Sequence, residues 1–168
     1  MNKCIFLDRD GVLNEEIGNY VFKKEDFHIV NGVPEALKKL KAAGYLLIVV
    51  TNQSGIAKGL YTKKDVLECH EMLQKECNYL LDDLYFCPHH EDFNTASLLK
   101  KPNSLMIEKA MAKYNIDPQM SWMIGDQPRD MEAGKKAGLK TIFISENQTE
   151  ILSEPCSSSL LNAVEFVA

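Results

Sequence analysis

The stretch KCIFLDRDGVLN, residues 3–14, decides how the rest of the chain is interpreted. Its apolar run, Cys4–Leu7, leads directly into two acidic residues, Asp8 and Asp10. Gly11 follows at once. An uninterrupted apolar run that stops at charge and glycine is typical of a buried strand that emerges at a tight turn. The sequence therefore places a pair of carboxylates at the end of a buried strand. Two negative charges this close repel each other, so the fold must supply a group that stabilises them.

Apolar runs alternate with helical patterns along the rest of the chain. The run Tyr45–Val50 shows no polar alternation, which indicates a strand buried on both faces, as in a parallel sheet with helices on each side. Because parallel neighbours need crossover helices, the alternation predicts an α/β fold with a doubly wound, mostly parallel sheet. Further strands are predicted at Leu84–Phe86, Trp122–Ile124 and Thr141–Ile144, and helices within residues 31–45, 62–80, 105–114, 129–137 and 160–166.

The composition bounds the kind of protein. The 168 residues are 45% hydrophobic and no stretch rich in glycine, serine and proline divides them, so a single domain over 1–168 is expected. A formal net charge of −5 argues against nucleic acid as a partner. No signal-peptide pattern and no apolar run near the ~20 residues that span a bilayer is present, so no membrane partner is expected. Five cysteines without a C-x-x-C pair suit reduced thiols, and we predict a cytoplasmic protein, monomeric by default.

The polar residues that stand out share one location, at or beside the carboxyl ends of the predicted strands, where open α/β sheets bind ligands. Two unit charges ~4 Å apart repel by about 4 kcal/mol at an effective dielectric constant near ~20, so clustered carboxylates require a cation, and oxygen ligands suit Mg²⁺. With the Thr51 hydroxyl as a donor and Lys101 as a fixed positive charge, the set can hold a phosphoryl group. Its members are Asp8 and Asp10 after the first strand, Thr51 and Asn52 after the second, Asp126 after the fourth, and Lys101 before the third helix.

These residues resemble the motifs of the haloacid dehalogenase-like phosphatases: D-x-D-G after the first strand, a Thr after the second, a Lys, and then G-D-x-x-x-D. The likeness is most specific to a branch without a cap domain, the D-glycero-D-manno-heptose 1,7-bisphosphate phosphatases and the related histidinol-phosphatase domains. It implies a Rossmann-like fold of the haloacid dehalogenase type with no large cap. The segments that carry it, in order over most of residues 3–145, are FLDRDGVLN, VVTNQSGIAKGLYT, CPHH, KKP and MIGDQPRDMEAGKKAGLKTIFI.

The resemblance implies a catalytic role for each acidic motif residue. Asp8 would be the nucleophile that forms an aspartyl-phosphate, which water then hydrolyses. Asp10 would protonate the leaving alkoxide and later activate that water. Mg²⁺ would be bound by the Asp8 carboxylate, the Asp10 backbone carbonyl and Asp126, while Asp130 supports the site from behind.

The resemblance also implies which residues contact the substrate, a small sugar phosphate with heptose 1,7-bisphosphate as the leading candidate. Thr51 and Asn52 would hold the phosphoryl oxygens, and Lys101 would neutralise charge in the transition state. Lys100 and Gln127 would lie beside the substrate, at positions where the branch usually has Arg and Lys. Because Lys does not reproduce bidentate contact by Arg, recognition of a second phosphate and the preferred anomer stay open.

A structural zinc site is the clearest departure from the resemblance. Many members of the branch bind zinc in the loop before the Lys with a C-x-H pair and a later C-x-C pair. Cys87 and His89 are present here, but the later positions correspond to Ser97 and Leu99, which cannot replace thiolates. We expect no structural zinc, or at most a weak, incomplete site that recruits His90.

Other functions remain as alternatives. Histidinol phosphate or another small metabolite is the nearest alternative substrate. A receiver-like signalling domain would place its phospho-acceptor after the third strand and its Lys after the last, where this chain has FCPHH and FIS. A catalytically inactive binding relative is disfavoured because no core motif residue is missing. Arg129 is interpreted as a surface charge at the start of a helix.

Overall fold

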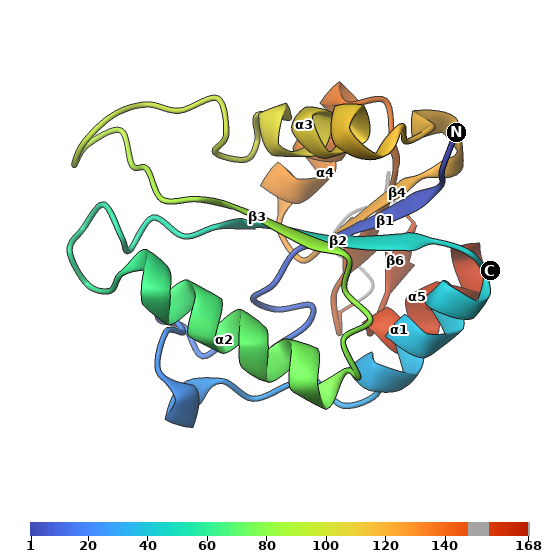
Figure 1. Cartoon of the computed structure of the whole chain (residues 1–168), viewed down its shortest axis with the longest axis horizontal. Coiled ribbons are helices and arrows are strands. Elements are labelled where there is room, and N and C mark those ends of the chain that lie inside the picture. The colour runs from blue at the N-terminus through green and yellow to red at the C-terminus, as the bar shows by residue number, and fades with distance from the viewer. Residues whose placement is uncertain (148–154, 168) are drawn as a thin grey trace.

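The computed structural model describes residues 1–147 and 155–167 and has the predicted α/β architecture (Figure 1). A six-stranded sheet with the order β3-β2-β1-β4-β5-β6 lies in the centre, and all its neighbouring strands are parallel. The strands are β1 (Cys4–Leu7), β2 (Leu46–Asn52), β3 (Asp83–Cys87), β4 (Trp122–Gly125), β5 (Lys140–Ile144) and β6 (Cys156–Ser157). The helices are α1 (Val33–Ala42), α2 (Lys63–Glu76), α3 (Leu105–Tyr114), α4 (Pro128–Lys136) and α5 (Leu160–Val167), with 3-10 turns η1 (Lys24–Asp26) and η2 (Pro118–Met120).

Helices cover both faces of the sheet and divide the core into two layers. Successive side chains of a strand point to opposite faces, so Ile5 and Leu7 pack with residues of α1, α2 and α5. Cys4 and Phe6 pack with residues of α3 and α4 instead. Figure 1 shows α3 and α4 on one side of the sheet and α1, α2 and α5 on the other. The run without polar alternation is therefore explained, because both faces of the central strands are buried.

A pair of local hydrogen bonds fixes the start of α2, which lies within the predicted range 62–80. The Thr62 hydroxyl accepts a hydrogen bond from the Asp65 N–H at 3.4 Å, and the Asp65 carboxylate accepts one from the Thr62 N–H at 2.7 Å. This reciprocal pair satisfies two backbone donors that a helix end otherwise leaves free. The predicted helix at residues 160–166 is also confirmed, as α5.

Two features of the sheet differ from the sequence prediction. The second strand extends two residues beyond Val50, because Thr51 and Asn52 pair with residues of β3. A sixth strand, β6, pairs with the end of β5 and was not predicted. Two residues carry no periodic pattern, so only the neighbouring strand identifies β6.

Because the strands are parallel, their carboxyl ends lie along one edge, toward the left of Figure 1. The segments that leave β1, β2 and β3 at this edge, residues 8–32, 53–62 and 88–104, contain one regular element, the turn η1. Within the described residues, no inserted cap domain covers the edge. No helix in residues 1–147 and 155–167 has the length and apolar character needed to cross a membrane.

Candidate active site

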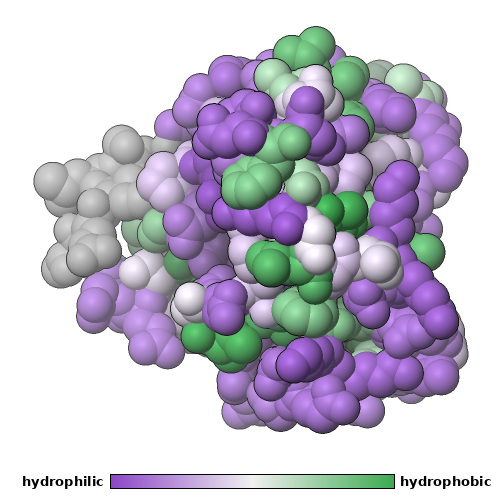
Figure 2. Space-filling model, turned by 90° about the vertical axis from the view of Figure 1, so that its left-hand side faces the viewer, coloured by the Kyte–Doolittle hydropathy of each residue, from purple (hydrophilic) through white to green (hydrophobic). Residues whose placement is uncertain are grey.

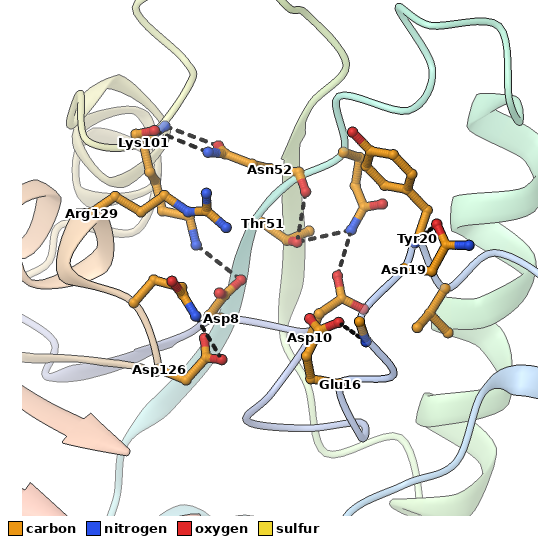
Figure 3. Close-up of a pocket in the computed structure, with 14 residues that line it drawn as sticks. Asp8, Asp10, Glu16, Asn19, Tyr20, Thr51, Asn52, Lys101, Asp126 and Arg129 are labelled. Atoms are coloured by element: carbon orange, nitrogen blue, oxygen red, sulfur yellow. Dashed lines mark hydrogen bonds and ion pairs between the residues drawn. The ribbon is translucent and has the colours of Figure 1, made fainter. Parts of the chain in front are cut away.

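A pocket of about 320 Å³ opens at the carboxyl edge of the sheet. Figure 2 faces this edge and shows mostly hydrophilic residues around a recessed centre. Side chains from the ends of β1, β2 and β4, from the loop before α3 and from the start of α4 meet here (Figure 3). Of the predicted site residues, those that line the pocket are Asp8, Asp10, Thr51, Asn52, Lys101, Asp126 and Gln127.

The turn after β1 brings Asp8 and Asp126 together. The Asp8 N–H donates to the Ile124 carbonyl of β4 at 3.0 Å, so the chain leaves the sheet in register with its neighbour. Gly11 then adopts a left-handed φ of +85°, and a side chain there would overlap the Asp126 carboxylate. The glycine of the D-x-D-G motif is therefore required both by backbone conformation and by the close approach of the fourth strand.

Lys101 is a buried cation, only 1% exposed, beneath the acidic residues. Its Nζ lies 2.9 Å from Asp8 Oδ1 and 2.7 Å from Asp130 Oδ1, and it donates to the Val50 carbonyl at 2.8 Å. The ammonium group is therefore held by two ion pairs and one hydrogen bond. Burial alone would lower the pKa of Lys101, but the carboxylates of Asp8 and Asp130 outweigh burial and raise it. Lys101 therefore presents a permanent positive charge to Asp8.

Asn52 holds the loop that carries Lys101. Its Nδ2 donates to the Lys101 carbonyl at 3.0 Å, and its Oδ1 accepts from the Lys101 N–H at 2.9 Å. Both polar atoms of the amide are thus paired with the backbone of a residue 49 positions away. This places Asn52 as a support for Lys101, whereas direct contact with a phosphoryl oxygen stays a prediction.

Asp10 is held by side chains that the sequence analysis does not include. Its Oδ1 accepts hydrogen bonds from Arg9 Nη2 at 2.8 Å, Arg9 Nε at 3.2 Å and Asn14 Nδ2 at 3.0 Å. Its Oδ2 accepts from Gln53 Nε2 at 3.1 Å, and Gln53 is in turn held by the Tyr61 hydroxyl at 2.6 Å. Arg9 and Gln53 are buried, so Asp10 keeps one orientation toward the pocket. In the sequence, only the position of Arg9 and Gln53 next to motif residues indicated that they belong to the site.

Gln53 also orients the hydroxyl of Thr51. Gln53 Nε2 donates to Thr51 Oγ1 at 3.0 Å. The nearest acceptor for the hydroxyl's own hydrogen is the Asn52 carbonyl at 3.5 Å, which is too long for a strong bond. The Thr51 hydroxyl can therefore donate its hydrogen to a group bound in the pocket.

Two carboxylate oxygens in the site fit a divalent cation. Asp8, Asp126 and Asp130 each offer an oxygen within 4.8 Å of the others. Asp130 is occupied by Lys101 and by the Gln127 N–H at 3.0 Å. Asp126 Oδ1 is buried without a hydrogen-bond partner, and Asp8 meets Lys101 with Oδ1, which leaves Oδ2 without a partner among the described residues. Unpaired oxygens on two carboxylates of one cluster suit a hard ion such as Mg²⁺.

The raised pKa values of Asp8 and Asp126 also support a cation site. Burial, followed by the charge of Asp130, raises the pKa of Asp8 to about 7, although Lys101 opposes the shift. Burial and the charge of Asp8 raise the pKa of Asp126 to about 6. The two carboxylates therefore hold protons more tightly than ordinary aspartates, because burial and repulsion between the carboxylates outweigh the attraction of Lys101.

Lys100 and Gln127, both expected beside the substrate, are placed differently. Lys100 is not part of the pocket wall, and its Nζ pairs with Glu91 at 2.6 Å. Gln127 lines the pocket, and its Nε2 donates to Asp126 Oδ2 at 3.3 Å. Contact with a substrate stays a prediction for both residues.

The loop after β3 contains the remnant of the zinc motif. His89 Nδ1 lies 3.1 Å from Asn94 Nδ2, and the His90 N–H donates to Asn94 Oδ1 at 3.0 Å. Cys87 is fully buried. Within residues 1–147 and 155–167, these side chains form no group of three that could share an ion.

The pocket wall also contains residues that the sequence analysis does not place there. Glu16, Asn19 and Tyr20 come from the loop after β1, and Arg129 comes from the first turn of α4. The interpretation of Arg129 as a surface charge is incomplete: the residue is exposed, but its side chain is turned into the pocket (Figure 3).

Comparisons with known proteins agree with this geometry. Residues 98–155 match a family model described as HAD-hydrolase-like. The chain is 43% identical over 151 residues to D-glycero-beta-D-manno-heptose-1,7-bisphosphate 7-phosphatase of Pasteurella multocida, covering 86% of this chain and 82% of the relative. It is 38% identical over 168 residues to the alpha-anomer phosphatase of Photorhabdus laumondii, covering 95% and 91%. The crystal structure of D,D-heptose 1,7-bisphosphate phosphatase from B. bronchiseptica, complexed with magnesium and phosphate, superposes with a TM-score of 0.88 at 24% identity over 98% of this chain and 97% of that one.

Proposed function

Because the chain belongs to the heptose-bisphosphate phosphatase branch of the haloacid dehalogenase-like hydrolases, we propose that it removes the 7-phosphate of D-glycero-D-manno-heptose 1,7-bisphosphate. The chain is an enzyme of the phosphoric monoester hydrolase class. The observation that carries the proposal is the buried Asp8 carboxylate, which lies between the Lys101 ammonium and the unpaired oxygen of Asp126.

Asp8 is the proposed nucleophile. Its carboxylate oxygen forms a bond to phosphorus while the bond from phosphorus to the sugar oxygen breaks, which gives an aspartyl-phosphate and an alkoxide. Lys101, 2.9 Å from Asp8 Oδ1, keeps positive charge beside the reacting group, and the Thr51 hydroxyl can donate to a phosphoryl oxygen. Donors fixed before the reaction stabilise charge as it develops, without reorganisation.

Asp10 is the proposed proton carrier. It lines the pocket and gives a proton to the leaving alkoxide, then takes one from the water that attacks the aspartyl-phosphate. That attack releases inorganic phosphate and restores the Asp8 carboxylate. The hydrogen bonds from Arg9 and Gln53 hold Asp10 in one orientation, so both transfers use the same geometry.

Mg²⁺ is the proposed cofactor, held by Asp8 and Asp126. The ion would supply the positive charge that lets an anionic carboxylate approach an anionic phosphate ester. Asp130 would not hold the ion directly, since its oxygens face Lys101 and the Gln127 N–H. This fits the role expected for it, support from behind.

We expect a substrate panel to separate the candidates. The two anomers of heptose 1,7-bisphosphate, the corresponding 7-phosphate, histidinol phosphate and a set of other sugar phosphates are compared by kcat/KM in the presence of Mg²⁺. One heptose bisphosphate anomer should exceed histidinol phosphate by about 10-fold or more, because polar groups in the pocket are left unpaired by the wrong substrate. A preference for histidinol phosphate would overturn the proposed substrate while leaving the phosphatase chemistry intact.

Binding of Mg²⁺ should stabilise the protein more at high pH than at low pH. The pKa of Asp8, about 7, and that of Asp126, about 6, exceed the ordinary value of 3.8. A raised pKa adds stability below about pH 4 that is lost as pH rises through 6 to 7, when the buried carboxylates ionise. The ion binds the ionised form, so it offsets this loss.

Thermal unfolding with and without Mg²⁺ at pH 5 and pH 8 measures the effect. The increase in Tm should be larger at pH 8. The control is Asp126→Asn, which should have a smaller Mg²⁺ response at both pH values. An equal Mg²⁺ response in the control would contradict binding between Asp8 and Asp126.

Four further statements remain proposals. The chain is taken as one domain, monomeric and cytoplasmic. Structural zinc is not expected, because Ser97 and Leu99 cannot act as thiolate ligands. The Nδ1 atoms of His89 and His90 also already lie within hydrogen-bond distance of Asn94 Nδ2 and the Asp92 N–H.

A further inference from the structure

Two cations line the pocket within the described residues, and only one of them is occupied. Lys101 is held by ion pairs with Asp8 and Asp130 and by a hydrogen bond to the Val50 carbonyl. Arg129 is exposed in the pocket wall, and its guanidinium has no hydrogen bond, ion pair or ring contact with the residues that the structure describes. One charged group in the pocket is therefore free to bind a ligand.

The position of Arg129 in the helix gives no structural reason for its charge. It is the second residue of α4, whose first turn carries the positive end of the helix dipole. Acidic side chains are favourable there, and Asp130 already occupies the neighbouring position. A cation in this turn is electrostatically unfavourable for the helix, so its charge is better explained by an anionic ligand than by helix stability.

The charges around the pocket indicate what Arg129 would bind. The wall has four carboxylates, from Asp8, Asp10, Glu16 and Asp126. Lys101 serves the buried end, where Asp8 reacts. A second anionic group on the substrate would lie nearer the mouth and would be repelled by the carboxylates unless a cation met it. Arginine suits such a group, because its planar fork contacts a phosphate with two parallel hydrogen bonds.

We infer that Arg129 binds the second phosphate of a bisphosphate substrate, the one that is not transferred to Asp8. The inference rests on the proposed function, which supplies a substrate with two phosphates. Arg129 is then a specificity-determining residue. It selects the doubly phosphorylated sugar and takes no part in breaking the ester bond. In Figure 3 its guanidinium extends into the pocket on the side of Asp8 and Lys101.

The test compares Arg129→Gln with the wild type on two substrates that share the reacting phosphate, heptose 1,7-bisphosphate and heptose 7-phosphate. The ratio of kcat/KM for the first to the second should fall by about 10- to 100-fold, because a charge-assisted contact is lost. Most of the change should appear in KM, and Arg129→Lys should restore part of it. The matched control is Lys39→Gln, an exposed lysine on α1 outside the pocket, which removes the same charge.

Each outcome of this test is informative. An unchanged ratio in Arg129→Gln would overturn the inference. An equal loss on both substrates would also overturn it, because Arg129 would then contact the reacting phosphate. If the wild type hydrolyses p-nitrophenyl phosphate but neither heptose phosphate, the proposed substrate fails. The inference is then judged by inhibition of p-nitrophenyl phosphate hydrolysis: bisphosphorylated sugars should inhibit more strongly than monophosphates, and Arg129→Gln should remove the difference.

Discussion

Asp8→Asn is expected to reduce Mg²⁺-dependent phosphate release by at least about 10⁴-fold, the scale of loss when a catalytic nucleophile is removed. An amide oxygen is a poor nucleophile and cannot form the aspartyl-phosphate. The substitution keeps the shape of the side chain, and its Oδ1 can still accept from the Arg9 N–H and from Lys101. The loss should therefore lie in kcat, measured by release of inorganic phosphate from the best substrate of the panel.

The fold should survive this change. The buried Asp8 carboxylate is repelled by Asp130, and burial raises its pKa to about 7, so a neutral amide relieves an unfavourable charge. We expect the urea midpoint of the Mg²⁺-free protein at pH 8 to be unchanged or higher. Asp92→Asn, an exposed aspartate outside the pocket, serves as the matched control and should keep full activity. Turnover close to the wild-type value in Asp8→Asn would refute the nucleophile assignment.

Lys101→Met should lower both activity and stability. Methionine has a similar length but no charge, so Asp8 and Asp130 would be left buried without their shared cation. Removal of one partner from a buried ion pair typically costs about 3–5 kcal/mol of unfolding free energy. Loss of preorganised positive charge should reduce kcat by about 10²- to 10³-fold. Urea unfolding and phosphate release measure the two effects.

A double variant separates the two roles of Lys101. Lys101→Met combined with Asp130→Asn removes one of the two stranded carboxylates, so it should recover part of the stability. Activity should remain low, because the charge beside Asp8 is still missing. Asp130→Asn alone completes the double-mutant cycle and serves as its reference for stability and activity. If Lys101→Met kept wild-type stability, or if the double variant regained activity, the buried network would not have the role assigned to it.

The order of strands and helices could be predicted from the sequence because its signals are local. Apolar runs identified β1 to β5 within a few residues, and Thr62 and Asp65 set the start of α2 through a bond between near neighbours. The short strand β6 was missed because two residues carry no pattern apart from the strand beside them. The end of β2 was placed too early for a related reason, since pairing with β3 extends it through polar residues.

Part of the candidate site was also predictable. Parallel strands end at one edge, so acidic residues after β1 and β4 had to lie close together, and the structure brings Asp8 and Asp126 into one pocket. The family resemblance implied that Lys100 lies beside the substrate, but Lys100 lies outside the pocket wall and pairs with Glu91. Neighbouring residues in a loop point in different directions, and the sequence does not show which of the two lysine side chains enters the pocket.

The sequence by itself determined the family, the layered α/β fold and the positions of the carboxylates proposed to react, because these follow from motifs and periods that short stretches carry. Only the tertiary structure decided which side chains and backbone groups each site residue contacts. The contacts of Lys101 with Asp8 and Asp130, of Gln53 with Asp10, and of Asn52 with the Lys101 backbone join residues far apart in the chain. That the guanidinium of Arg129 has no partner among the described residues depends equally on which side chains surround it. The direction and pairing of a side chain are set by packing against distant segments, which no local pattern encodes.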